Sequence, residues 1–291
     1  MLAAATFSLN PIQDLQAMLA YDFMRNALVA GGCIAVAAGL VGYFVVLRNQ
    51  VFTTDALGHV AFTGGLGGLL IGLNLLVGVF TSCIAAALAI GSFGGRGRGR
   101  DVAVGVVFAW VLGLGVLFLS IFTSSRSGVI GSAGNVGISV LFGSILGIQP
   151  AQALIASVTG ILTSVAAVAL ARPLLFVSLD PDVATSRGVP IRVVTAFFLI
   201  LVAITVAESV QAVGALLVFG LMVTPAAVAQ NLTTRPYAGM ALSAAVALLA
   251  VWLGLTLAFF ISYPASFFIT ALAFGAFIVS IGVTLFRRAG R

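Results

Sequence analysis

The sequence predicts an all-α membrane protein, a polytopic bundle of about eight or nine transmembrane helices with one further short re-entrant or surface helix. Composition is the first reason: of 291 residues, 62% are hydrophobic and only 7% are charged, whereas a soluble domain carries about 25% charged residues. Patterning is the second, because the hydrophobic residues gather into runs of about 20 residues, the length of helix that crosses a bilayer. We therefore expect residues 1–291 to form a single transmembrane domain.

The apolar runs define the expected spans in chain order. They fall at about 24–47, 52–73, 75–93, 102–122, 135–148, 151–171, 191–207, 212–232, 236–261 and 264–286. The run 135–148 is too short to cross a bilayer, so we expect it to be the re-entrant or surface helix. Residues 1–23 carry apolar side chains at intervals of three to four residues, which predicts a helix lying on the membrane surface before the first span.

The basic residues predict an orientation and exclude two functions. All thirteen are arginine, and eleven of them lie on the cytoplasmic side if the C-terminus is cytoplasmic and the N-terminus is outside. Arginines scattered between apolar runs do not form the basic stripe of a nucleic-acid-binding protein. Because the chain has no lysine, it has no Walker A loop and is not expected to hydrolyse ATP by that route.

Asp55 and His59 form the candidate site, because they place an acid and the only histidine four residues apart inside an apolar run. On a helix the two side chains share one face. A carboxylate oxygen and an imidazole nitrogen make up half of a coordination sphere for zinc, manganese or iron. An ionisable group at bilayer depth costs about 2.5–3.5 kcal/mol and normally faces a substrate path. The alternative is a structural pair, in which Asp55 caps a helix and His59 hydrogen-bonds a neighbouring helix.

Depth in the bilayer separates this pair from a third candidate. Counting from Arg48 at the cytoplasmic edge, a helix rising about 1.5 Å per residue places Asp55 about 10 Å and His59 about 16 Å into the membrane. Glu208 follows the run 191–207, so we expect it near the outer boundary. There its carboxylate either attracts a metal cation to the entrance or is merely solvated.

Proline and glycine predict where helices break and where they approach closely. Thr224-Pro225 interrupts the run 212–232, because proline removes a backbone donor, and a broken helix either borders a substrate path or forms a packing kink. The pairs Gly64/Gly68 and Gly143/Gly147 have the four-residue spacing that allows two helices to pack closely.

The loop Arg172–Arg192 predicts a helix of about two turns on the cytoplasmic face, within residues 179–190. Asp180 is a good N-cap, Pro181 suits the first helical position, and Gly188 followed by Pro190 ends the helix. Such a helix is either inert or the surface that a cytosolic partner binds.

Four segments together resemble the permease subunits of the zinc/manganese/iron-type metal ABC importers. They are Arg48 followed by Asp55-Ala56-Leu57-Gly58-His59, similar to an arginine and then G-D-A-hydrophobic-S-H-A; Leu141–Leu146, similar to L-F-G-x-I-L; Asp180 to Pro190, similar to D-E-x-x-A-x-x-x-G-x-P; and Val213–Ala229, similar to V-G-x-L-L-V with a T/I-P-A-A-x-A tail. The chain departs from the pattern at Thr54, Gly58 and Pro181, where glycine, serine and an acid are usual.

The resemblance implies the fold of the cobalamin and siderophore importers and a homodimer in the bacterial inner membrane. It also implies two copies of a separate ATPase, an extracytoplasmic metal-binding protein, and zinc, manganese or iron as cargo with no permanently bound cofactor. Asp180, Ala184, Gly188 and Pro190 match the motif of the helix that couples such permeases to the ATPase.

ATP-driven import of a divalent metal is therefore the expected function, and the chain itself is not an enzyme. The alternative is a proton-coupled secondary transporter of a metal or small solute, with Asp55, His59 and Glu208 as the relay. Dependence on an ATPase partner distinguishes the two. An intramembrane metalloprotease of the H-E-x-x-H type needs two histidines, and only His59 is present.

Overall fold

The structure, a computed structural model, describes residues 18–92, 98–124, 140–179, 181–215, 217–261 and 263–289. Within these ranges the chain forms helices and turns and no β-strand, which confirms the all-α prediction. The surface helix expected over residues 1–23 falls mostly outside the described residues.

Seven of the described helices are long and apolar enough to cross a membrane. They are α2 (Asp22–Leu47), α4 (Leu75–Ser92), α5 (Arg98–Ser124), α7 (Pro150–Ala169), α10 (Ile191–Val213), α12 (Pro236–Phe260) and α13 (Ala265–Ala289). Two more run beside them: α3 (Val51–Leu70), which contains Asp55 and His59, and α11 (Val218–Leu232), which has 15 residues. The shorter elements are the 3₁₀ turn η1 (Ile145–Gly147), α8 (Ala171–Leu179) and α9 (Pro181–Ser186).

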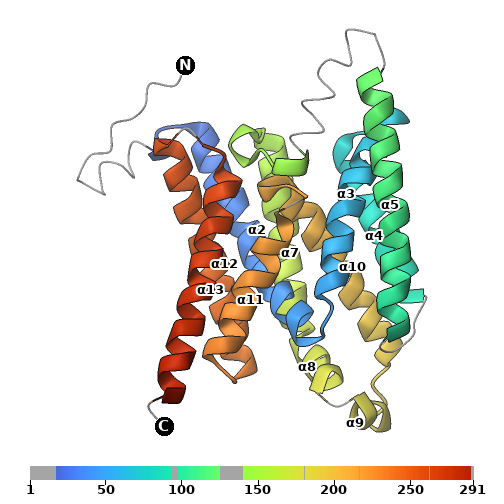
Figure 1. The fold of residues 1–291 in the computed structure, drawn as a ribbon, viewed down its shortest axis with the longest axis vertical. Helices are drawn as coiled ribbons and strands as arrows, with labels where there is room; N and C mark the ends of the chain where they lie inside the picture. The colour runs from blue at the N-terminus through green and yellow to red at the C-terminus, as the bar shows by residue number, and fades with distance from the viewer. Residues whose placement is uncertain are drawn as a thin grey trace.

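The long helices run up and down along one axis, so the bundle has two distinct ends (Figure 1). α8, α9 and the C-terminal end of α13 lie at one end, and the start of α2 and η1 lie at the other. We call the first the inner end and the second the outer end, following the positive-inside rule. At the inner end, Arg48 donates a hydrogen bond to Thr195 Oγ1 (3.0 Å) and stacks over the Phe198 ring at 5.0 Å, which ties the α2–α3 turn to α10.

α2 is the central helix, and small residues allow its neighbours to approach. A Cβ atom added at Gly39 would lie 2.8 Å from the backbone nitrogen of Ala244 on α12, and one at Gly42 would overlap the Met222 carbonyl of α11. Ser243 also donates a hydrogen bond to the Gly39 carbonyl (2.7 Å). A larger side chain at either glycine would therefore force whole helices apart, because the atoms it meets are backbone.

The structure confirms one of the two predicted glycine pairs and contradicts the other. Gly64 and Gly68 pack against Gly78 of α4, where a Cβ at Gly68 would lie 2.8 Å from the Gly78 Cα, so the predicted close helix contact is confirmed. The interpretation of Gly143/Gly147 as a helical pair is wrong. Gly143 has φ of +74° and lies in a turn before η1, so the two residues do not share a helix face.

Two helix boundaries also differ from the sequence prediction. α8 follows α7 directly and buries Leu174, Leu175 and Val177, although the sequence predicts only one short helix in this loop. α10 continues to Val213 instead of ending at residue 207. The described part of 135–148 stays at the outer end beside the start of α7 and does not cross the bundle.

Candidate metal-transport site

Asp55 and His59 lie within α3, one turn apart and half-buried. The His59 ring packs edge-to-face on Phe108 of α5, with ring centroids 5.1 Å apart. Asp55 does not cap α3, whose N-cap residue is Gln50. In the part of the chain that the structure describes, neither side chain makes a hydrogen bond or an ion pair, so packing alone positions them. Their oxygen and nitrogen atoms are therefore available to a ligand.

The pair lies somewhat closer to the inner end than the sequence suggests. The chain turns at Arg48–Gln50, and α3 starts at Val51. At about 1.5 Å per residue, Asp55 is about 6 Å and His59 about 12 Å along α3. Because α3 has 20 residues, it is about 30 Å long, and both side chains lie well inside its two ends.

Between them, Gly58 packs against a break in the neighbouring helices. A Cβ added at Gly58 would lie 2.9 Å from Val218 Cγ1 and 3.1 Å from the carbonyl oxygen of Ala215. Ala215 belongs to the turn that separates α10 from α11, and Val218 is the first residue of α11. The Asp55–His59 turn is thus in direct contact with an interruption of the helical backbone.

This break is not where the sequence predicts it. α11 runs through Pro225 without interruption. The helix is instead broken after α10, where the C-cap residue Gly214 has φ of +85°, and α11 starts at Val218. The expectation of a broken helix at Thr224-Pro225 is therefore wrong. Only glycine readily adopts the backbone conformation found at Gly214.

Gly143, at the outer end of the bundle, packs against this break. A Cβ at Gly143 would lie 2.7 Å from the Ala212 oxygen and 2.7 Å from the Gly214 nitrogen, so the two glycines are in backbone contact. Ala215 N–H also donates to the Val140 carbonyl (2.9 Å). The two glycine-containing segments that resemble L-F-G and V-G thus pair with each other, a contact that sequence reasoning missed. The feature of the sequence that could have indicated this contact is the glycine present in both motifs.

Glu208 is elsewhere and is not at the outer boundary. It lies inside α10 with no exposed surface, and its Oε1 is 3.4 Å from Thr163 Oγ1 of α7. The expected position at the outer boundary is wrong, because α10 extends past Glu208 and buries the carboxylate, which is therefore not solvated. Among the described residues, no three acidic, histidine or cysteine side chains form a group that could hold a metal ion. Asp55, His59 and Glu208 therefore do not form one cluster, and the proton-relay alternative lacks its geometry.

The predicted cytoplasmic helix corresponds to α9. It starts at Pro181, and its C-terminus is closed by hydrogen bonds from Gly188 N–H to the Thr185 carbonyl (3.0 Å) and from Val189 N–H to the Ala184 carbonyl (3.0 Å). Gly188 has φ of +77°, as a glycine that ends a helix should. Ala184 is fully buried, so it seats α9 on the bundle, whereas its neighbour Val183 is 41% exposed.

The first and last residues of the motif from Asp180 to Pro190 lie on either side of α9. Pro190 is the N-cap residue of α10, so it begins the next helix directly after the α9 turn. Asp180, the expected N-cap of α9, lies outside the described residues.

Comparisons with known proteins agree with the four motifs. Residues 20–284 match the ABC 3 transport family. The manganese transport system membrane protein MntC of Listeria innocua is 28% identical over 222 residues, which cover 76% of each chain. The manganese import system permease protein ScaB of Streptococcus parasanguinis is 29% identical over 236 residues, 81% of each chain. An uncharacterized membrane protein of Synechocystis is 28% identical over 97% of this chain and 96% of its own.

Solved structures share the fold. PsaBC from Streptococcus pneumoniae in complex with Fab superposes with a TM-score of 0.80 at 24% identity, covering 93% of this chain and 95% of the other. A putative metal-chelate type ABC transporter in an inward-facing conformation superposes with a TM-score of 0.69 at 18% identity. The family match spans nearly the whole chain, so the chain belongs to the ABC 3 transport family of membrane permeases, and its role is transport and not catalysis.

Proposed function

We propose that this chain is the permease subunit of an ABC importer that moves a divalent transition metal into the cytoplasm, with Asp55 and His59 binding the ion in transit. Manganese is the favoured cargo, because the relatives MntC and ScaB carry manganese in their names. Zinc and iron are alternative cargoes, since a carboxylate and an imidazole also suit those ions.

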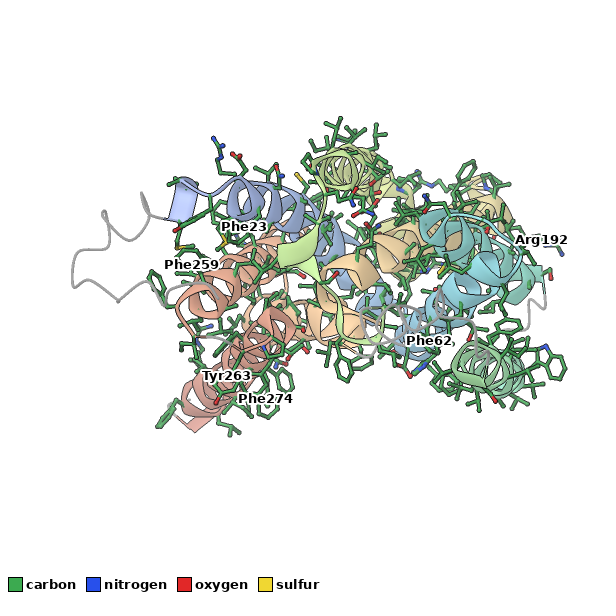
Figure 2. The ribbon with its side chains drawn as sticks, turned by 90° about the horizontal axis from the view of Figure 1, so that it is seen from above. Phe23, Phe62, Arg192, Phe259, Tyr263 and Phe274 are labelled. Carbon is green, nitrogen blue, oxygen red and sulfur yellow. The ribbon has the colours of Figure 1, made fainter. Side chains whose placement is uncertain are left out.

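The observation that carries the proposal is the unpartnered state of both side chains within the described residues. A carboxylate facing lipid is costly, so the α3 face that carries the pair must be covered by protein or water. α5 covers part of this face, because Phe62, which shares it, is only 8% exposed, whereas Asp55 and His59 stay half-buried (Figure 2 labels Phe62). In this proposal a second copy of the chain packs on this side of the bundle and covers the rest of the face. The Asp55–His59 pair then borders a path for the ion between the two subunits.

A homodimer also completes the coordination sphere. Two copies bring two carboxylates and two imidazoles to one interface, and water fills the remaining positions. The Ala215 carbonyl contacts the same turn of α3, because it lies 3.1 Å from the position of a Cβ added at Gly58. A site shared between two subunits opens when they move apart, which lets the ion leave, whereas a complete cage in one subunit would retain it.

The partners follow from the two ends of the bundle. Two copies of an ATPase dock at the inner end on the exposed side of α9 and the turn that follows it, where Val183 and Arg187 are exposed. A metal-binding protein delivers the ion at the outer end. The assembly lies in the bacterial inner membrane, with the permease in multi-pass form.

Metal uptake by vesicles that contain the permease and its ATPase tests the site. Asp55→Asn and His59→Ala should each lower manganese uptake by at least about 10–100-fold, the effect known for losing even an outer partner of a metal ligand. Thermal stability should stay close to wild type, because neither substitution breaks a hydrogen bond. The matched control is Thr63→Val on the same helix, which removes the hydrogen bond to the Val111 carbonyl (3.0 Å) and should leave uptake near wild type.

Uptake near the wild-type rate in either variant would show that the pair is structural. Uptake that proceeds without the ATPase and collapses when the proton gradient is removed would favour the secondary transporter. Repeating the titration with zinc and iron identifies the cargo.

A further inference from the structure

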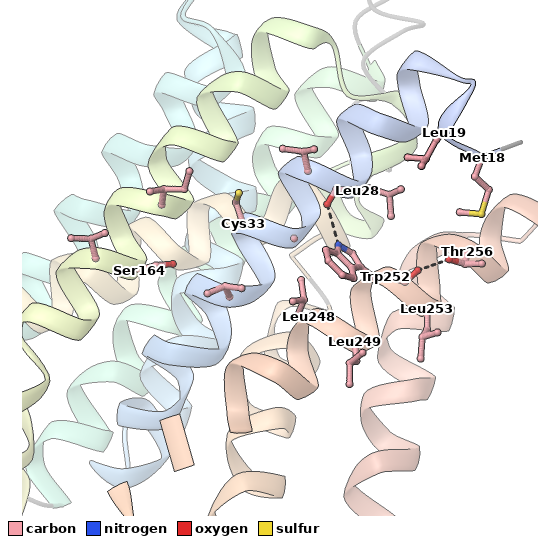
Figure 3. A pocket seen from close by; sticks show the side chains of 15 residues that line it. Met18, Leu19, Leu28, Cys33, Ser164, Leu248, Leu249, Trp252, Leu253 and Thr256 are labelled. Carbon is pink, nitrogen blue, oxygen red and sulfur yellow. Dashed lines mark hydrogen bonds between the residues drawn. The ribbon is translucent and has the colours of Figure 1, made fainter. Parts of the chain in front are cut away.

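A long groove lies on the outside of the bundle, away from Asp55 and His59. α2 forms its floor from Leu28 to Val36, and α7 and α12 form its walls (Figure 3). Its volume of about 800 Å³ lies within the range of about 300–1,000 Å³ typical of pockets that hold a whole small ligand. Val29, Val165 and Leu253 line it and are each more than half exposed. The lining from α2 follows the outer start of that helix and the lining from α12 precedes its outer end, so the groove opens toward the outer leaflet.

The lining presents hydrocarbon to an occupant, because its polar groups are already bonded within the chain. Trp252 Nε1 donates to the Leu28 carbonyl (3.2 Å) across the groove (Figure 3). Ser164 donates to the Gly160 carbonyl (2.7 Å), and Thr256 donates to the Trp252 carbonyl (2.8 Å). A polar metabolite would lose its hydration here without gaining hydrogen bonds, whereas an acyl chain would not.

Gly32 allows the indole to lie against the floor. A Cβ at this position would lie 3.1 Å from Trp252 Nε1, so a larger residue would push the ring outward. Trp252 remains 46% exposed, and its free face borders the groove. The ring therefore contacts whatever occupies the groove.

The first turn of α2, which precedes the part of the helix that lines the groove, carries a charge pair. Asp22 and Arg25 form an ion pair in the first turn of α2, and both side chains are more than half exposed. Asp22, Arg25, Val29 and Gly32 follow one another along α2 at steps of three, four and three residues. All four therefore lie on one face of the helix. An adjacent cation and anion match a headgroup that carries a phosphate and an ammonium group.

We propose that this groove binds one glycerophospholipid of the outer leaflet with an ammonium-bearing headgroup. The acyl chains lie along α2 between α7 and α12, the phosphate meets Arg25, and the ammonium group meets Asp22. This site is independent of the proposed metal path.

The chain has two tryptophans, which provides a direct assay. In Trp110→Phe, Trp252 is the single fluorophore, and phospholipids with brominated chains quench it on contact. The full chain is reconstituted in phosphatidylcholine vesicles that contain brominated phosphatidylethanolamine or brominated phosphatidylglycerol. We expect phosphatidylethanolamine to bind about threefold more tightly, the gain of one exposed ion-pair interaction.

Matched variants separate the groove from the general lipid surface. Leu162 is 62% exposed on α7 at similar depth and does not line the groove. Leu162→Trp in a Trp110→Phe, Trp252→Phe background should show no headgroup preference. Val29→Phe, which fills the groove, should abolish the preference of Trp252, whereas Val158→Phe on α7 should not. Asp22→Asn combined with Arg25→Gln should abolish the preference while quenching persists.

Three results would overturn the proposal. Equal quenching of Trp252 by all headgroups would make the groove ordinary lipid-facing surface. No quenching by any brominated lipid would mean that protein covers the groove. Quenching that rises when residues 1–17 are removed would assign the groove to the chain's own N-terminal segment.

Discussion

Gly214→Ala should be among the most damaging single-methyl changes in the chain. Gly214 has φ of +85° and ψ of +161°, a conformation almost restricted to glycine, and forcing alanine into it costs about 1–3 kcal/mol. The added Cβ would also overlap the Leu141 carbonyl oxygen and the Gly143 nitrogen. These are backbone atoms and cannot rotate away, so overpacking adds about 1–3 kcal/mol more.

Two other glycines separate these effects. Gly188 has φ of +77°, but a Cβ added there would meet no atom within 4 Å, so Gly188→Ala should show only the conformational cost of about 1–2 kcal/mol. Gly282 lies in α13 with open space around it, and Gly282→Ala should stabilise the helix by about 0.5–1 kcal/mol.

Thermal unfolding of the purified permease in one detergent gives the ranking. The expected order of melting temperature, from highest to lowest, is Gly282→Ala, wild type, Gly188→Ala and then Gly214→Ala, with Gly214→Ala also losing metal uptake. Gly214→Ala melting at or above Gly188→Ala would refute the backbone contact with Gly143 as the main cost.

Further substitutions test α9, where the proposal places the ATPase contact, and the buried carboxylate inside α10. Ala184→Arg should unseat α9 and prevent co-purification of the ATPase, because Ala184 is fully buried, while the exposed change Val183→Ala should weaken the ATPase contact and keep α9 folded. Normal assembly of Ala184→Arg would contradict this packing. Glu208→Gln should leave uptake at low metal concentration unchanged, because the carboxylate is buried against α7. Slower low-metal uptake in Glu208→Gln would restore an entrance role.

The sequence predicts the spans well wherever a run is long and strongly apolar. The run 24–47 corresponds to α2 and the run 236–261 to α12, since such segments have no alternative to a membrane helix. The boundaries fail where tertiary contacts decide. The sequence predicts a span that stops before Glu208 because charge usually ends a span, but packing against Thr163 of α7 buries the carboxylate inside α10.

The same reason explains the misplaced break. Proline is a strong local signal and favours a break at Pro225, yet α11 continues through that residue. The actual break depends on Gly214 meeting Gly143, which lies about seventy positions earlier in the chain. Local helix propensity does not encode a contact between residues so far apart in the chain. Gly143 and Gly214 therefore indicate the position of the break only when the folded structure shows that they meet.

Gly58 joins the predicted pair to this unpredicted break. Serine is usual at this position in the resembling permeases, and its absence removes a hydroxyl between Asp55 and His59. In this chain a Cβ at Gly58 would press on Val218 and on the Ala215 carbonyl, so the small residue is what lets the break pack against α3.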